Sequence, residues 1–197
     1  MSVFFKNRDS QTPLEENLRD ELKFPLIQNM TELYEHELEN IAMGIPWKNV
    51  GKKDHTDQSV WLAYHKHLLG EVWKFAGTVR KSDLANEEFM KAYDVRVGLR
   101  NLQDDLRCWL GHSSFPPQKM MAIFHQRLLT IHPFRDGNGR WSRLLTNWIC
   151  EKESFPIPSW GQKIADDEER RVSYIKAVKK SRTGDHRDLI SFMFEDH

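Results

Sequence analysis

The feature that most constrains this chain is a twelve-residue stretch, residues 132–143, which reads His-Pro-Phe-Arg-Asp-Gly-Asn-Gly-Arg-Trp-Ser-Arg. It places a proton acceptor, a hard oxygen ligand, a turn that can expose successive backbone N–H groups, and two fixed cations within a few residues. In chain order these are His132, Asp136, the turn Gly137, Asn138 and Gly139, and the pair Arg140 and Arg143. Any fold of this chain has to accommodate that many polar groups at one place.

A helix is predicted directly after the turn. Apolar residues recur at helical spacing, at positions 141, 144, 145, 148 and 149, so we expect a helix that begins near Asn138 and buries this stripe. Arg140, Arg143 and Asn147 fall within about 60° of one another, away from the stripe. The first N–H groups of a helix favour an anion, and arginine forks match phosphate oxygens. The sequence therefore predicts a phosphate site.

Two more side chains fit that prediction. Asp136 suits Mg²⁺, because this ion usually takes one or two carboxylates together with substrate phosphates. His132 stands before the turn, where a base could reach a hydroxyl that attacks the bound phosphate. Taken alone, His-Pro-Phe is more often a packed loop and Gly-Asn-Gly is more often only a turn. Their combination at the start of a helix favours a functional site.

The stretch resembles the signature of the Fic/Doc family, H-x-F-x-[D/E]-G-N-G-R-x-x-R, and fills each of its specified positions. The likeness extends to residues 73–80, 124–132, 174–178 and 184–189, and covers roughly residues 26–195. Three short segments, at 32–33, 39–41 and 159–161, resemble the bacterial branch called mobile mystery protein B.

This resemblance implies transfer of AMP from ATP to a protein hydroxyl, with release of pyrophosphate. His132 would be the general base, Asp136 the Mg²⁺ ligand and Phe134 the buried anchor of the loop. The phosphates would be held by Gly137, Asn138, Gly139, Arg140 and Arg143. The phosphorylating Doc branch has Ala-Asn-Lys in place of Gly-Asn-Gly, so this chain is expected to be a nucleotidyltransferase.

The expected fold is mainly α-helical, a single Fic-type domain with a small β-hairpin flap. Residues 1–25 are expected to be an N-terminal arm, 26–46 a candidate inhibitory helix and 47–197 the domain core. Helices are predicted at about 31–43, 57–75, 93–110, from 117 to the signature, from 138, at 167–182 and at 185–194. His65 and His67, on different faces of the second of these, are expected to be surface histidines.

The 26–46 helix carries acids that resemble an inhibitory pattern of the family, [S/T]-x-x-x-E-[G/N]. In that pattern the Glu pairs with the second signature arginine, here Arg143. Glu39 followed by Asn40 matches its end, although Glu35 stands where Ser or Thr is required. Glu35 is the second candidate, because Thr31 precedes it at the right spacing. A solvated acidic helix is the alternative.

Two other assignments come from the resemblance. The flap, with Gly77, Thr78, Val79 and Arg80, would dock an extended segment of the target by β-augmentation, although a surface loop explains these residues as well. Trp160 is a candidate adenine contact, and packing is the alternative. His125 is expected to be a packed or hydrogen-bonded core residue.

Composition sets the outer bounds. With 197 residues, 39% of them hydrophobic, the chain is long enough for one globular core. A formal net charge of zero gives no reason to expect nucleic acid or an anionic membrane as a partner. Cys108 and Cys150 are expected to be reduced thiols, and the N-terminus has no signal-like apolar run, so a cytoplasmic protein is expected.

Two other kinds of function stay open. The same site could remove AMP or transfer another phosphate-containing group. Alternatively, the chain could be a toxin-like or nucleotide-sensing module that binds a partner and is regulated by its own N-terminal helix or by an antitoxin-like protein. For the adenylyl-transfer reading, ATP is the expected substrate and Mg²⁺ the expected metal.

Overall fold

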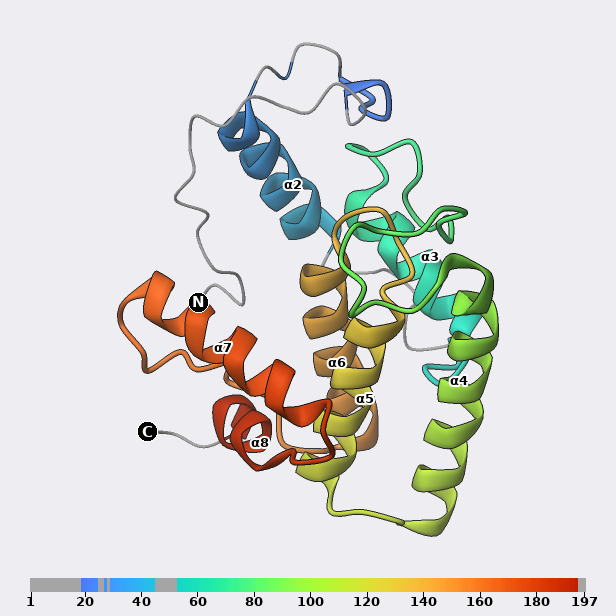
Figure 1. Cartoon of the computed structure of the whole chain (residues 1–197), viewed down its shortest axis with the longest axis vertical. Helices are drawn as coiled ribbons and strands as arrows, with labels where there is room; N and C mark the ends of the chain where they lie inside the picture. The colour runs from blue at the N-terminus through green and yellow to red at the C-terminus, as the bar shows by residue number, and fades with distance from the viewer. Residues whose placement is uncertain (1–18, 25–26, 28, 45–52, 195–197) are drawn as a thin grey trace.

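A computed structural model describes residues 19–24, 27, 29–44 and 53–194, so most of the predicted arm and part of the 47–57 loop lie outside the described residues. Seven α-helices are defined within these ranges (Figure 1). They are α2 (Met30–Gly44), α3 (Gln58–Leu69), α4 (Val95–His112), α5 (Pro117–Ile131), α6 (Asn138–Glu153), α7 (Asp167–Ser181) and α8 (Arg187–Phe194), with the short 3₁₀ turn η2 (Ala92–Asp94) before α4.

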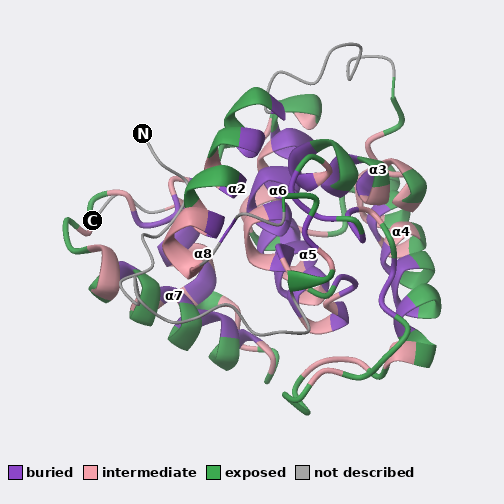
Figure 2. Cartoon of the chain, turned by 90° about the horizontal axis from the view of Figure 1, so that it is seen from above, coloured by how far each residue is buried: buried purple, intermediate pink, exposed green. Residues whose placement is uncertain are grey.

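Helices α5 and α6 form the centre of the molecule, and the other helices pack around them (Figures 1 and 2). Helix α6 is buried on most of its circumference, including the side that carries Ser142, Arg143 and Thr146. Helix α4 covers one flank of α5, while α7 and α8 cover the other. The signature thus spans the link between the two central helices, with His132 at the end of α5 and Asn138 at the start of α6.

The mainly α-helical prediction is confirmed, but the predicted hairpin is wrong. Residues 76–91 form turns and extended backbone without a named strand, and the pairing seen among the described residues is one isolated bridge between Leu22 and Trp73. The segment is instead folded around the buried side chain of Arg80. Its guanidinium donates to the carbonyl oxygens of Ser82 (2.9 Å) and Met90, at two separate points of the loop. A side chain therefore holds the loop closed where cross-strand bonds were expected.

The predicted helix over 57–75 ends early, at Leu69, because the chain turns there. The N–H groups of Val72 and Trp73 both donate to the Leu69 carbonyl, at 3.1 and 2.9 Å. This turn directs Trp73 toward α2. Cys108 and Cys150 are free thiols, as predicted.

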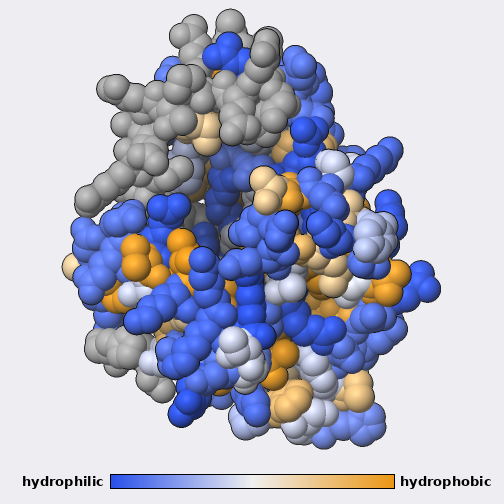
Figure 3. Space-filling model, viewed as in Figure 1, coloured by the Kyte–Doolittle hydropathy of each residue, from blue (hydrophilic) through white to orange (hydrophobic). Residues whose placement is uncertain are grey.

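The face shown in Figure 3 is hydrophilic over most of its area, with hydrophobic residues in separate groups. Val172 and Ile175, both exposed on α7, are among the exposed apolar side chains of the molecule. Among the described helices, none combines the length and the apolar character needed to cross a membrane.

Candidate active site

His132 lies where α5 ends, and its backbone fixes how its ring is presented. The residue adopts the left-handed conformation (φ 47°) and its N–H donates to the Leu128 carbonyl. Its ring Nδ1 lies 3.2 Å from the Leu129 carbonyl oxygen, which can only accept, so Nδ1 carries the proton. Nε2 is therefore left without a proton and able to accept one, while the catalytic role predicted for this residue from the sequence stays a prediction.

The ring of His132 is covered by the loop that precedes η2. Phe89 stacks on it with ring centroids 3.7 Å apart. Arg182, at the end of α7, forms an ion pair with Glu88 of this loop, and its guanidinium lies over the Phe89 ring. Burial lowers the pKa of His132 to about 4, so the imidazole is neutral at pH 7 and able to accept a proton.

The Gly-Asn-Gly turn is built for close packing on one side and open space on the other. Gly137 has φ 79°, and a Cβ added to it would lie 2.3 Å from a methyl carbon of Leu69. A Cβ on Gly139 would meet only the Arg143 guanidinium, at 3.8 Å. Asn138 closes the loop, since its amide bonds both the N–H and the carbonyl of Phe134, at 3.0 and 2.9 Å. The turn therefore offers backbone N–H groups and room, while the Asn138 side chain is structural.

His65 is buried beside this turn and hydrogen-bonds the residue before it, contrary to the prediction that it lies on the surface. Helix α3 is packed between α2, α4 and α6, so its buried face is wide enough to include this residue. Gly77 N–H donates to Nδ1 (3.0 Å), which leaves Nε2 as the donor to the Asp136 carbonyl (3.1 Å). The ring also stacks on Phe134, at 3.6 Å between centroids, and Phe134 is the buried anchor that was predicted.

Arg140 is held by a carboxylate that the sequence reasoning missed. Both oxygens of Glu37 on α2 accept from its guanidinium, one of them at 2.9 Å, in a two-point fork. Glu37 is 3% exposed, and one of its oxygens also accepts from the Trp73 indole N–H at 2.7 Å. Asp136 approaches the same guanidinium at 3.3 Å. Burial raises the pKa of Glu37, and the Arg140 charge opposes that rise.

The predicted inhibitory candidates, Glu35 and Glu39, lie elsewhere on α2. Both are exposed, and Glu39, with 74% of its side chain accessible, pairs with His36 at 3.8 Å. A signal for Glu37 was present in the sequence. Leu33, Ile41 and Gly44 follow helical spacing with it, so Glu37 is a charged residue on the apolar face of α2. Such a position requires a buried partner.

Arg143 is held by α7. It hydrogen-bonds the Tyr174 hydroxyl, and its guanidinium carbon lies 5.4 Å from the centre of the Tyr174 ring. Asn147, one helical turn further, accepts from the indole N–H of Trp160 at 2.9 Å. The polar side of α6 predicted from the sequence thus exists, but it faces α2, α7 and the loop at Trp160.

The remaining candidates are placed as follows. Trp160 is buried and packs against His125, at 4.7 Å between ring centroids, as the packing alternative had it. In the flap, Thr78 is exposed, whereas Val79 and Arg80 are buried. Arg80 also donates to the carbonyl of His132 (2.8 Å), so its side chain connects the flap to the base. His125 is a hydrogen-bonded core residue, as predicted.

Asp136 is the residue of this site best able to hold a metal. Its side chain is 44% exposed and lies at the mouth of the turn. Among the described residues, no group of three or more His, Cys, Asp or Glu side chains is arranged for a metal ion. One carboxylate next to the predicted phosphate site fits Mg²⁺, which usually takes substrate phosphates and water as the rest of its ligands.

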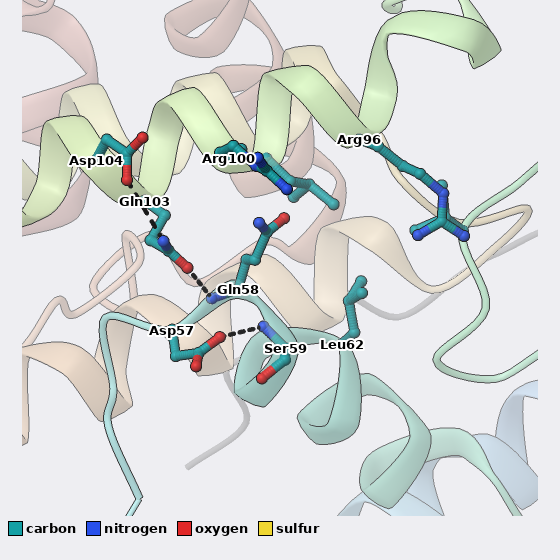
Figure 4. Close-up of a pocket in the computed structure, with 10 residues that line it drawn as sticks. Asp57, Gln58, Ser59, Leu62, Arg96, Arg100, Gln103 and Asp104 are labelled. Carbon is teal, nitrogen blue, oxygen red and sulfur yellow. Dashed lines mark hydrogen bonds between the residues drawn. The ribbon is translucent and has the colours of Figure 1, made fainter.

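A separate hollow of about 690 Å³ lies between the start of α3 and the first half of α4 (Figure 4). Asp57 caps α3 there by accepting from the Ser59 N–H at 2.7 Å, and Gln103 accepts from the Gln58 N–H at 2.9 Å. Arg96 and Arg100 line the hollow from α4. Its lining residues do not include the signature, so it is distinct from the site around His132.

Comparison with known proteins agrees with this geometry. The model of the family described as "Fic/DOC family" matches residues 55–150. A protein adenylyltransferase Fic of Drosophila sechellia is 35% identical over 150 residues, which are 73% of this chain and 28% of that protein. Among the first curated relatives the chain spans only 26–28% of the full length.

Solved structures show the same fold. A Caenorhabditis elegans Fic-1 fragment superposes with a TM-score of 0.61 at 26% identity, covering 81% of this chain and 47% of that one. The BepC protein of Bartonella tribocorum superposes with a TM-score of 0.65 at 16% identity, covering 93% and 91%. The match over residues 55–150 therefore shows that this chain contains a Fic/DOC family domain.

Proposed function

We propose that this protein transfers AMP from ATP to a hydroxyl group of a target protein. One observation supports this proposal most directly. The neutral imidazole of His132 precedes the start of α6, and the first turns of that helix carry Arg140 and Arg143. Its similarity to relatives named protein adenylyltransferases supports the reaction class, and the bound AMPPNP of the BepC structure supports the nucleotide.

In the proposed reaction, His132 Nε2 accepts the proton of the attacking hydroxyl. The hydroxyl oxygen forms a bond to the α-phosphorus of ATP, the bond from that phosphorus to the bridging oxygen breaks, and pyrophosphate leaves. The N–H groups at the start of α6 and the two arginines stabilise the phosphate charge. Mg²⁺, held by Asp136, would neutralise part of that charge.

We further propose that α2 restrains this activity through Glu37. The carboxylate occupies the guanidinium fork that a phosphate would use, and anion binding at Arg140 requires that contact to be replaced. This revises the choice of residue made from the motif, since Glu35 and Glu39 are exposed. A toxin-like pairing with an antitoxin-like regulator would fit such a restraint, since a partner that moved α2 would change the state of Arg140.

The test is self-labelling with ATP labelled at the α-phosphate in the presence of Mg²⁺. We would compare the wild type with Glu37→Gly, with the matched surface variants Glu35→Gly and Glu39→Gly, and with the double variant Glu37→Gly/His132→Ala. We expect label above the wild-type level in Glu37→Gly alone, and its loss in the double variant. Label in Glu39→Gly with none in Glu37→Gly would restore the motif-based choice.

The absence of label from every variant, with ATP still bound, would favour AMP removal or a nucleotide-sensing module. AMP removal has its own assay, the release of AMP from a pre-modified protein substrate.

A further inference from the structure

A chain of buried polar side chains runs through the centre of the molecule and ends on Arg143. Thr146 on α6 lies 3.3 Å from Nδ1 of His125 on α5, and Nε2 of His125 lies 2.8 Å from the Tyr174 hydroxyl on α7. His125 and Thr146 are fully buried, and Tyr174 and Arg143 nearly so. Helix α6 thus contributes Thr146 and Arg143, and α5 and α7 contribute one member each. Buried groups of this kind are ordinarily all hydrogen-bonded.

The direction of each hydrogen bond in the chain can be assigned from its Thr146 end. The Thr146 hydroxyl donates to the Ser142 carbonyl at 2.7 Å, so its oxygen is an acceptor toward His125. The Ser142 carbonyl, which also contacts the His125 ring, can only accept. The Thr146 oxygen beside Nδ1 therefore requires a proton on that nitrogen. Burial lowers the pKa of His125 to about 3, so the neutral ring carries this one proton and Nε2 is bare.

The opposite end of the chain requires the same arrangement. A guanidinium has five donors and no acceptor, so the Tyr174 oxygen must accept from Arg143. Its own proton then has to point elsewhere, and the bare Nε2 of His125 is the acceptor it reaches. With the proton on Nε2 instead, the phenol O–H would be directed at a group that has only donors.

Aromatic packing restrains Tyr174 further. The ring of Phe192 on α8 lies 5.6 Å from its ring, and that of Trp160 lies 6.5 Å away. Tyr174 is located beyond residue 150, where the match to the family model ends. A signature arginine is thus oriented by a helix outside the matched segment.

We infer that Tyr174 and His125 are positioning residues, which aim the Arg143 guanidinium at the phosphates of the bound nucleotide through a hydrogen-bond chain with one allowed direction. The inference rests on the proposed function for its consequence in catalysis, but the direction of the chain can be tested without any turnover. An oriented guanidinium loses less side-chain freedom when an anion binds, which is how preorganisation strengthens binding.

The first experiment measures the tautomer of His125 by nitrogen NMR of the ¹⁵N-histidine-labelled protein at pH 7, with His125→Gln used to assign the signal. We expect a neutral ring with the proton on Nδ1. In Tyr174→Phe the Nε2 resonance should move toward that of a nitrogen without a hydrogen-bond donor. A proton on Nε2 in the wild type would overturn the inference, whether or not the protein transfers AMP.

The second experiment measures ATP dependence in a background that labels, the Glu37→Gly variant. Tyr174→Phe should raise KM for ATP about tenfold, in line with the loss of one hydrogen bond to a charged group. The value of kcat should stay within about twofold, because a group that aids binding of substrate and transition state equally changes KM alone. Tyr64→Phe, which removes the hydroxyl of another buried tyrosine, should leave both parameters unchanged.

A matched pair at His125 separates positioning from packing. His125→Gln keeps an acceptor for the Tyr174 hydroxyl and should retain a KM within about threefold of the parent, whereas His125→Leu removes the acceptor and should resemble Tyr174→Phe. Equal KM values for Gln and Leu, with equal thermal stability, would overturn the inference. An absence of label in the parent would count against the proposed function alone, and binding of ATP by calorimetry would then replace KM as the readout.

Discussion

The two signature arginines are both largely buried, but the protein holds them in different ways. Arg140 is engaged by a carboxylate, Glu37, which lies on the N-terminal helix α2. Arg143 is engaged by a phenol, Tyr174, which lies on α7. At Arg143, burial lowers the pKa of the guanidinium. At Arg140 the same effect of burial is outweighed by the charges of Glu37 and Asp136, and the pKa is raised.

If the two arginines bind the nucleotide as proposed, this difference means that only one of the two contacts competes with it. A carboxylate and a phosphate seek the same fork of a guanidinium, so a phosphate on Arg140 has to replace Glu37. A phenol oxygen accepts one hydrogen bond and leaves the positive charge in place, so a phosphate can add to Arg143 without removing Tyr174. The Arg140 side is therefore suited to control, and the Arg143 side to orientation.

The largest effect is expected from removing the charge at Glu37. Breaking a buried ion pair at one partner typically costs about 3–5 kcal/mol, and Glu37→Gln should approach the lower figure because Arg140 retains 13% exposure. Saturating ATP and Mg²⁺ should then restore more stability in this variant than in the wild type, since phosphate can pair with Arg140. Urea unfolding with and without nucleotide measures both effects.

The control for that experiment is Glu39→Gln, on the exposed side of the same helix. It should unfold within about 0.5 kcal/mol of the wild type, as surface changes usually do. An equal nucleotide-induced shift in Glu37→Gln and in the wild type would show that Glu37 does not compete with phosphate.

The pH dependence of unfolding tests whether His125, the hydrogen-bond partner of Tyr174, stays neutral in the folded protein. Burial lowers the pKa of His125 from 6.5 to about 3. Between these two pH values the unfolded chain binds a proton at this residue and the folded chain does not. Stability from this residue is therefore complete above pH 6.5 and is lost as the pH falls toward 3. Between pH 7 and 5 the loss is about 2 kcal/mol, from about 1.5 pH units at 1.36 kcal/mol each.

His125→Gln should show a shallower fall in unfolding free energy over this interval than the wild type. His67→Gln, which changes an exposed histidine of α3, should follow the wild-type curve. Parallel curves for the wild type and His125→Gln would show that His125 does not remain neutral in the folded protein.

The contrast between the arginines also shows what the sequence can predict. The signature and the helical spacing after it were sufficient to predict the start of α6, the buried role of Phe134 and the gathering of polar groups at one helix start. These features depend on neighbouring residues in the chain. The partner of Arg140 depends on how α2 is rotated against the core, and the motif led to Glu35 and Glu39, which that rotation leaves exposed.

Other differences have the same physical origin. His65 was predicted to be exposed because its own helix gave no reason to bury it, yet α3 is enclosed on several sides and the histidine joins Gly77 to Asp136. The predicted hairpin is replaced by a loop in which Arg80 binds the carbonyl groups of Ser82 and Met90, and also that of His132, which is distant in the sequence. In each case the outcome depends on side-chain contacts that hydrophobic spacing does not encode.

The smallest expected effect concerns the rings rather than the hydrogen bonds. Each arginine faces a tyrosine ring, with the guanidinium carbon of Arg140 6.0 Å from the centre of Tyr34 and that of Arg143 5.4 Å from the centre of Tyr174. A cation over a partly exposed ring contributes about 0.5–1 kcal/mol. We expect the Tyr174 hydroxyl to orient Arg143, whereas Arg140 is already held by the Glu37 carboxylate. Removing the phenol hydroxyl should therefore weaken ATP binding at Tyr174 but not at Tyr34.

Tyr34→Phe should therefore leave the unfolding free energy and the affinity for ATP nearly unchanged, while Tyr34→Leu should cost about 0.5–1 kcal/mol through loss of the ring face. Denaturant unfolding and calorimetric ATP binding of the two variants with Glu37 in place, measured beside Tyr174→Phe, provide the comparison. A loss of ATP affinity in Tyr34→Phe as large as that in Tyr174→Phe would mean that both arginines are oriented by phenol oxygens. The assignment of control to Arg140 and of orientation to Arg143 would then be wrong.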